Sequence, residues 1–253
     1  MQALLISDPE ADKSAASLDV RVGGALEPRE FFGTAHFLEH MLFMGTEKYP
    51  NENEYSEYIT NNGGFNNAYT SLTNTNYHFD CSNEGFEGAL DRFSQFFIAP
   101  LLHESSTERE MEAVDSEFTQ SMQSDAWRFM SLMEVGIAVP GSTMDRFNCG
   151  NLKSLKKDGI RDALLTYLKD WYSANIMKLC IIGNHSLDQL EAWARTYFSP
   201  IVNKSLVLPP LDPTPSFTQD CLAKLLRWVP VKDEDILTFA WPNMPYCQLE
   251  HRT

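Results

Sequence analysis

Two histidines in the segment HFLEH, residues 36–40, are the first sign of chemistry in this chain. His36 and His40 are four residues apart, so on a helix they lie one turn apart on the same face and can bind one metal ion. Glu39 lies within a turn of His36, close enough to reach a water molecule on that metal. This H-x-x-E-H pattern reverses the commoner H-E-x-x-H zinc motif and keeps the same groups. The pattern therefore predicts a hydrolytic zinc site.

The surrounding residues predict a buried helix for this segment. Gly33 and Gly45 mark its two ends. The positions between are largely apolar, namely Phe37, Leu38, Met41, Leu42 and Met44. The alternative interpretation is a pair of core histidines satisfied by hydrogen bonds, which is the usual situation of a single buried histidine. The two histidines together with Glu39 favour the metal site.

A hydrolytic zinc site needs three protein ligands and one open position, so a third ligand must come from elsewhere. The best candidates lie in TEREMEAVDSEF, residues 107–118. Glu110 and Glu117 are seven residues apart there, two helical turns, and so share a helix face. One carboxylate can bind the metal while the other supports the site. Carboxylates on a helix usually form a solvated face, but the upstream motif favours a functional interpretation.

Longer stretches resemble the insulin-degrading enzyme and nardilysin branch of the pitrilysin family of zinc metallopeptidases. They are HFLEHMLFMGTEKYP from residue 36, NENEY from residue 51 and EMEAVDSE from residue 110, together with LISDP, NYHFD, GALDRF, DAWR and PVKD elsewhere. The resemblance covers nearly the whole chain. It implies zinc ligands at His36, His40 and Glu117. It further implies a general base at Glu39 and a supporting carboxylate at Glu110.

The resemblance also implies a reaction and a substrate site. The reaction is hydrolysis of peptide bonds with one zinc ion per chain, in which Glu39 takes a proton from water and passes it to the leaving amine. The substrate site is an edge strand at Asn67, Ala68 and Tyr69, where an extended peptide adds through main-chain hydrogen bonds. The alternative for these three residues is an ordinary half-buried strand. The expected partners are peptide substrates.

Composition limits the other classes of partner. The 253 residues carry a formal net charge of −15, which argues against nucleic acid or an anionic membrane and suits positively charged peptides. The start of the chain lacks the basic residues of a signal peptide, and no apolar run reaches membrane-spanning length. The five cysteines form no C-x-x-C pair, which favours free thiols; they are Cys81, Cys149, Cys180, Cys221 and Cys247. We therefore expect a cytoplasmic protein.

A proline-rich stretch divides the chain. We expect a zinc metallopeptidase domain at residues 1–205, a linker at 206–215, and the truncated start of a second, similar domain at 216–253. The resemblance places one more strand before Gln2, so the first domain lacks an expected first strand. It also implies two halves that close around the substrate. The alternative function is therefore a non-catalytic fragment that binds zinc or peptides and needs a complementary half or a homo-oligomer.

The resemblance implies an α+β fold class, a mostly antiparallel mixed sheet flanked by helices, similar to a mitochondrial-processing-peptidase-like metallohydrolase domain. Period-two patterns predict strands at residues 2–7, 17–24, 65–72, 75–81 and 177–182. Helical periodicity predicts helices at 52–60, 84–97, 106–134, 158–174 and 186–198, with SSTE at 105–108 as an N-terminal capping signal. Two further strands are predicted at 223–231 and 235–241.

Overall fold

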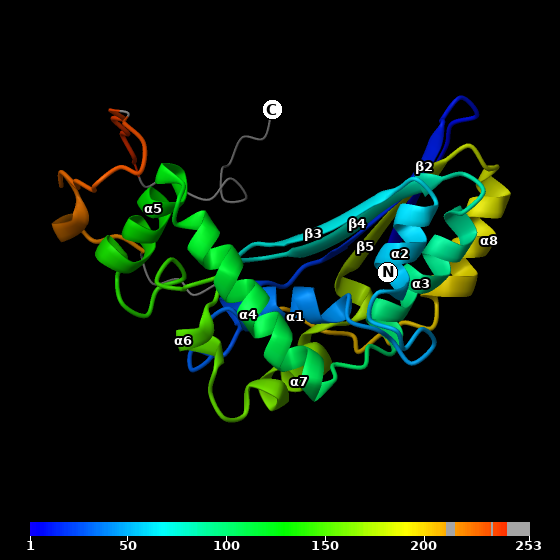
Figure 1. Cartoon of the computed structure of the whole chain (residues 1–253), viewed down its shortest axis with the longest axis horizontal. Coiled ribbons are helices and arrows are strands. Elements are labelled where there is room, and N and C mark those ends of the chain that lie inside the picture. Colours follow the sequence, from blue (N-terminus) through cyan, green and yellow to red (C-terminus); the bar gives the residue numbers. More distant parts are fainter. Residues whose placement is uncertain (211–215, 234, 242–253) are drawn as a thin grey trace.

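The computed structural model describes residues 1–210, 216–233 and 235–241. One five-stranded sheet is covered by helices on one face, which confirms the expected α+β class (Figure 1). Its strands are β1 (Gln2–Ser7), β2 (Lys13–Val20), β3 (Phe65–Thr70), β4 (Thr75–Ser82) and β5 (Met177–Gly183). Their order is β1-β5-β2-β4-β3. Only β1 and β5 pair in parallel, so the sheet is mostly antiparallel, as predicted.

Eight α-helices are described, most of them packed beneath the sheet in the view of Figure 1. They are α1 (Thr34–Leu42), α2 (Glu54–Asn61), α3 (Phe86–Ile98), α4 (Glu104–Ser121), α5 (Asp125–Ser131), α6 (Leu152–Leu155), α7 (Ile160–Trp171) and α8 (Leu187–Phe198). Shorter helical turns are η1 (Gly24–Leu26), η2 (Leu132–Ile137), η3 (Ala174–Ile176) and η4 (Gln219–Cys221).

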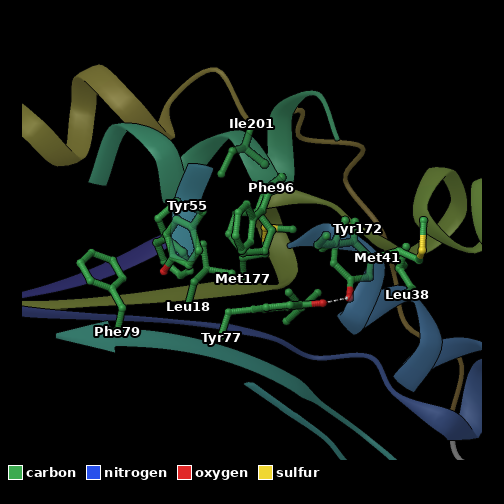
Figure 2. Close-up of a cluster of buried hydrophobic side chains, with 14 of the residues drawn as sticks. Leu18, Leu38, Met41, Tyr55, Tyr77, Phe79, Phe96, Tyr172, Met177 and Ile201 are labelled. Atoms are coloured by element: carbon green, nitrogen blue, oxygen red, sulfur yellow. Dashed lines mark hydrogen bonds between the residues drawn. The ribbon is translucent and has the colours of Figure 1, made fainter. Parts of the chain in front are cut away.

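The core between sheet and helices is rich in aromatic side chains (Figure 2). Tyr77 and Phe79 point from β4 toward the helices, where Phe79 meets Tyr55 of α2 and Tyr77 meets Phe96 of α3. The hydroxyl of Tyr77 lies 2.8 Å from that of Tyr172, so two buried polar groups satisfy one another. This packing fixes the buried side of α1 and leaves its other side for the candidate site.

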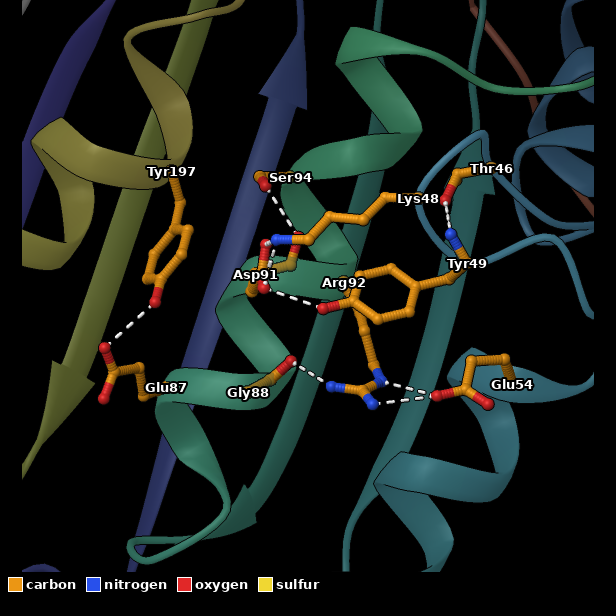
Figure 3. Close-up of polar contacts among 10 residues, drawn as sticks. All are labelled: Thr46, Lys48, Tyr49, Glu54, Glu87, Gly88, Asp91, Arg92, Ser94 and Tyr197. Atoms are coloured by element: carbon orange, nitrogen blue, oxygen red, sulfur yellow. Dashed lines mark hydrogen bonds and ion pairs between the residues drawn. The ribbon is translucent and has the colours of Figure 1, made fainter.

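A polar network on the outer side of α3 ties neighbouring elements together (Figure 3). The Arg92 guanidinium donates two hydrogen bonds to Glu54 of α2, at 2.8 and 3.1 Å. The same group lies over the rings of Tyr49 and Tyr58, 4.4 and 3.8 Å from their centroids. Asp91 accepts a hydrogen bond from the Tyr49 hydroxyl at 2.7 Å. The network therefore joins α2, α3 and the loop that follows α1.

The second predicted strand begins and ends earlier than expected. Residues 17–24 were predicted, whereas β2 covers Lys13–Val20. Its early residues form a strand because β2 lies inside the sheet, with β4 on one side and β5 on the other. The two partners impose extended backbone on a polar and alanine-rich stretch with little strand propensity of its own. The strand ends before Gly24, where η1 begins.

The predicted helix at residues 106–134 is two α-helices followed by a π-helical turn. α4 ends at Ser121 and α5 begins at Asp125. Arg128 stabilises the turn between them by donating to the Met122 carbonyl at 2.7 Å. Asp125 faces the C-terminal segment instead, where it accepts the N–H of Val231 at 3.0 Å. These tertiary contacts change the helix direction, and the local pattern does not reveal them.

The predicted capping signal of α4 is also wrong. The helix begins at Glu104 with His103 as its N-cap residue, and no side chain caps it. Ser106 lies inside the first turn and is fully buried, and its hydroxyl donates to Glu52. The serine therefore joins α4 to the segment before α2.

The two strands predicted at residues 223–231 and 235–241 are absent from the described residues, where both segments are irregular. A strand requires a hydrogen-bonded neighbour, and no described segment pairs with them. Residues 216–233 contact α5 instead. The Trp228 ring lies 5.5 Å from that of Phe129, and Arg128 donates to the Val229 carbonyl at 3.0 Å.

Two further expectations concern the cysteines and membrane-spanning segments. No disulfide joins any cysteine in the described part of the chain, and Cys247 lies outside that part. Among the described helices, none combines the length and the apolar character needed to cross a bilayer.

Candidate metal centre

Helix α1 begins just before the first candidate ligand and is held there by a buried carboxylate. Its N-cap residue, Gly33, has a left-handed backbone with φ of +92° and offers no side-chain cap. Glu27 supplies the acceptors, at 3.0 Å from the N–H of Gly33 and 3.1 Å from that of Ala35. Burial raises the pKa of Glu27 to about 8, although these N–H groups lower it. The start of α1 is therefore fixed from outside the helix.

The three predicted ligands come together at one point. The Nε2 atoms of His36 and His40 are 3.3 Å apart. Glu117 Oε2 lies 3.6 Å from the first and 3.3 Å from the second. Tetrahedral zinc ligands at about 2.0–2.1 Å from the metal are about 3.4 Å from one another. The spacing of these donors therefore fits one zinc ion.

Hydrogen bonds on the far side of each imidazole leave the metal-facing nitrogen available. His36 Nδ1 lies 2.6 Å from the carbonyl oxygen of Cys149, which can only accept a hydrogen bond. His40 Nδ1 lies 3.5 Å from Glu110 Oε2. Such outer contacts orient metal-binding imidazoles and make them better donors. Glu110 therefore contacts the outer nitrogen of His40, and its supporting role stays a prediction.

The electrostatics of the cluster suit a cation. Burial by itself lowers the pKa of His40, but hydrogen bonds to Glu110 and Glu117 raise it to about 9. The hydrogen bond from His40 and the charge of His36 lower the pKa of Glu117. The carboxylates thus attract positive charge to this point. Two imidazoles and one carboxylate are a donor set of hydrolytic zinc sites.

Glu39 projects toward the same cavity from α1. Its side chain is largely buried, and its Oε2 accepts a hydrogen bond from the Thr70 hydroxyl at the end of β3. Burial raises the pKa of the Glu39 carboxyl, while His36 and the Thr70 hydrogen bond lower it. The general-base role of Glu39 stays a prediction, and a buried carboxyl of raised pKa facing the cavity suits it.

The cavity around these groups has a volume of about 600 Å³. Asn67, Ala68 and Tyr69 line it, and they belong to β3, which is an edge strand of the described sheet. Phe43 and Trp127 add aromatic surface. No lysine or arginine of the described residues lines the cavity. The structure thus joins the predicted substrate strand and the predicted metal site in one cavity.

Sequence reasoning missed three contacts of the site. Cys149 contributes a main-chain carbonyl, and the identity of a side chain carries no signal for that role. Thr70 falls in an ordinary strand pattern, and only the fold brings it to Glu39. Trp127 was assigned to a continuous helix, whereas the turn before α5 brings it to the cavity wall.

Comparison with known families agrees with this architecture. Residues 2–136 match the model of the insulinase family, peptidase family M16, and residues 159–251 match the model of the peptidase M16 inactive domain. The first match covers more than half of the chain. The chain therefore belongs to the insulinase family of peptidases.

Individual proteins with names typical of this family are also similar to the chain. A putative zinc protease of Schizosaccharomyces pombe, mug138, is 46% identical over 96% of this chain, and human insulin-degrading enzyme is 44% identical over 92%. The A-factor-processing enzyme of Saccharomyces cerevisiae is 44% identical over 96%. The crystal structure of pitrilysin superimposes with a TM-score of 0.82 over 87% of this chain, at 36% identity.

The chain is short beside these relatives. It spans 25% of the S. pombe protein, 23% of human insulin-degrading enzyme and 23% of the pitrilysin chain. The part of the chain that matches the insulinase family model, residues 2–136, contains the candidate metal ligands and β3.

Proposed function

We propose that this chain is a zinc-dependent metalloendopeptidase domain that hydrolyses peptide bonds of peptides and small proteins. The observation that carries the proposal is the cluster of His36, His40 and Glu117, whose donors have the spacing of tetrahedral zinc ligands. Glu39 faces the same cavity. Relatives named zinc protease and insulin-degrading enzyme support the same activity.

Each residue has a definite task in this proposal. His36, His40 and Glu117 hold one zinc ion, which acts as a Lewis acid and lowers the pKa of water to about 7. Glu39 accepts the proton of the attacking water and delivers it to the leaving amine. Glu110 holds the ring of His40 in place.

The substrate is bound as an extended peptide along β3. Its main chain hydrogen-bonds to the free edge of the strand at Asn67, Ala68 and Tyr69, and its side chains alternate toward and away from the cavity. Binding of this kind recognises an extended conformation more than a particular sequence. The glutamates of the cavity and the net charge of −15 favour positively charged peptides.

A single preparation tests the proposal. The purified chain is assayed for bound zinc and for cleavage of a quenched fluorescent basic peptide, with Glu39→Gln beside it. We expect about one zinc per chain in both proteins and at least a 100-fold lower turnover in the variant, because general base catalysis is lost. Glu57→Gln, an exposed glutamate of α2, is the matched control and keeps full turnover. Zinc lost together with activity in Glu39→Gln contradicts a pure base role.

A second candidate function is binding of zinc and extended peptides, with turnover dependent on a complementary half. The cavity joins the candidate ligands to the edge strand β3, so both could be bound without a catalytic step. The absence of a described cation in the cavity wall agrees with this, since a reacting carbonyl oxygen gains from a positively charged donor. Stoichiometric zinc and measurable peptide affinity without turnover identify this function.

A further inference from the structure

The candidate ligands come from two helices, and one short segment of chain contacts both. α1 carries His36 and His40, and α4 carries Glu117. The segment is residues 149–152, which lead into α6. Figure 1 shows α6 beside α4. Within this segment, main-chain atoms make the contacts.

On the α1 side, the segment contacts the first ligand and the start of the helix. The carbonyl oxygen of Cys149 lies 2.6 Å from His36 Nδ1. Gly150 lies against Gly33, so close that a Cβ on Gly33 would be 2.3 Å from the Gly150 Cα. The backbone of both glycines is also left-handed, with φ of +78° at Gly150 and +92° at Gly33. Two backbones therefore meet where neither position accepts a side chain.

On the α4 side, the contact is a single hydrogen bond. The N–H of Leu152 donates to Asp115 Oδ1 at 2.9 Å. Leu152 is the first residue of α6, where a helical N–H has no partner within its own helix. Asn151 and Ser154 form a capping box that satisfies other groups of the same turn. Asp115 lies two residues before Glu117 and does not line the cavity.

We propose that residues 149–152 clamp the metal centre and that Asp115 is a positioning residue. The Leu152 N–H holds α4 through Asp115 while the Cys149 carbonyl holds His36. Together they set the 3.6 Å separation between His36 Nε2 and Glu117 Oε2. This inference rests on the proposed zinc site. Loss of such an outer contact typically weakens metal affinity by about 10- to 100-fold.

Two substitutions remove the same hydrogen bond from opposite ends. Asp115→Ala deletes the acceptor, and Leu152→Pro deletes the donor. Proline is tolerated at the first position of a helix, and the extended backbone of Asn151, with φ −161° and ψ 177°, suits a residue before proline. Leu152→Ala keeps the N–H and controls for the lost side chain. Glu112→Gln is the control for Asp115→Ala. It removes one charge from α4, the helix of Asp115, at a side chain that is 62% exposed.

Zinc affinity is measured by competition with a chromophoric chelator, and ligand geometry by the visible spectrum of the Co²⁺ form. We expect Asp115→Ala and Leu152→Pro each to weaken zinc binding at least 10-fold and to alter the Co²⁺ spectrum. The double variant binds no more weakly than either single one, because both remove one interaction. Asp115→Asn keeps an acceptor and recovers most of the affinity. Leu152→Ala and Glu112→Gln stay within about threefold of the parent.

Several results overturn the clamp. One is an Asp115→Ala protein, folded by circular dichroism, with the parent's zinc affinity and Co²⁺ spectrum. Others are losses that multiply in the double variant, or an equal loss in Leu152→Ala. If Asp115→Ala does not fold, the comparison of Leu152→Pro with Leu152→Ala decides the matter. A parent chain that binds no zinc overturns the proposed function as well, whereas stoichiometric zinc with unaffected variants overturns the clamp alone.

Discussion

In the proposed zinc site, a proton on His40 would link zinc binding to pH. Glu110 and Glu117 hold the pKa of His40 at about 9 against the lowering effect of burial, and a histidine must be neutral to bind metal. Below pH 9, zinc therefore displaces this proton, and we expect the apparent affinity to rise up to about tenfold per pH unit until pH 9. Titration calorimetry in buffers of different ionisation enthalpy measures the protons released, which should decrease between pH 8 and 10.

The Glu110→Gln variant provides the control for this behaviour. It removes one of the three carboxylates that raise the pKa of His40, so the decrease in proton release should move to lower pH. Proton release that stays constant from pH 8 to 10 in the parent chain contradicts the assignment of this proton to His40.

At the scale of residues, the sequence predicts which side chains gather at the candidate metal site. It does not predict which main-chain groups contact them. The helical repeat places His36 and His40 on one face, and the same repeat relates Glu110 to Glu117. The structure brings the predicted trio together, while its role as a zinc site remains a prediction. The Cys149 carbonyl and the Leu152 N–H belong to the backbone, which every residue has. Only the fold shows which of these groups face the site.

At the scale of elements, Arg92 holds α2 against α3. Its guanidinium combines two hydrogen bonds to Glu54 with two aromatic faces. Lysine keeps the charge but loses the planar fork that makes these contacts at once. We expect Arg92→Lys to lower the free energy of unfolding by about 1–2 kcal/mol. Urea unfolding monitored by circular dichroism measures the change.

The control for Arg92→Lys is the same substitution at an arginine that lies outside this network. Arg195 pairs with Glu191 on the surface of α8, and its side chain is 77% exposed. An exposed pair one helical turn apart contributes only about 0.3–0.5 kcal/mol. Arg195→Lys should therefore leave the urea midpoint almost unchanged. Equal effects of the two substitutions contradict a special role for Arg92.

The prediction of elements was limited by tertiary contacts. Leu18 and Val20 of β2 are fully buried, in agreement with the period-two pattern that burial on one face imposes on a strand. Residues 223–231 and 235–241 also suggest strands, but a strand forms only beside a partner, and the described residues provide none. At the break between α4 and α5, Asp125 and Arg128 also make contacts with distant parts of the chain.

At the scale of the whole molecule, the proposed division into residues 1–205, 206–215 and 216–253 remains a prediction. The first residues of the proposed linker are fixed to the first domain, because Leu206 exchanges two hydrogen bonds with Asn175 of η3, at 2.8 and 3.1 Å. The segment after it contacts α5 and exposes apolar side chains to solvent. The described residues after position 215 thus present apolar surface.

This surface predicts association of the chain with itself. Phe239 and Trp241 are 69% and 78% exposed, and their rings stack with centroids 6.0 Å apart. We expect the apparent mass from light scattering to rise with protein concentration, since exposed aromatic clusters favour burial against another surface. Phe239→Asp combined with Trp241→Asp should restore a constant monomer mass. Val202→Asp, which adds charge at a valine that is 62% exposed and lies outside this cluster, should not. A monomeric parent at every concentration would show that this apolar surface does not drive association.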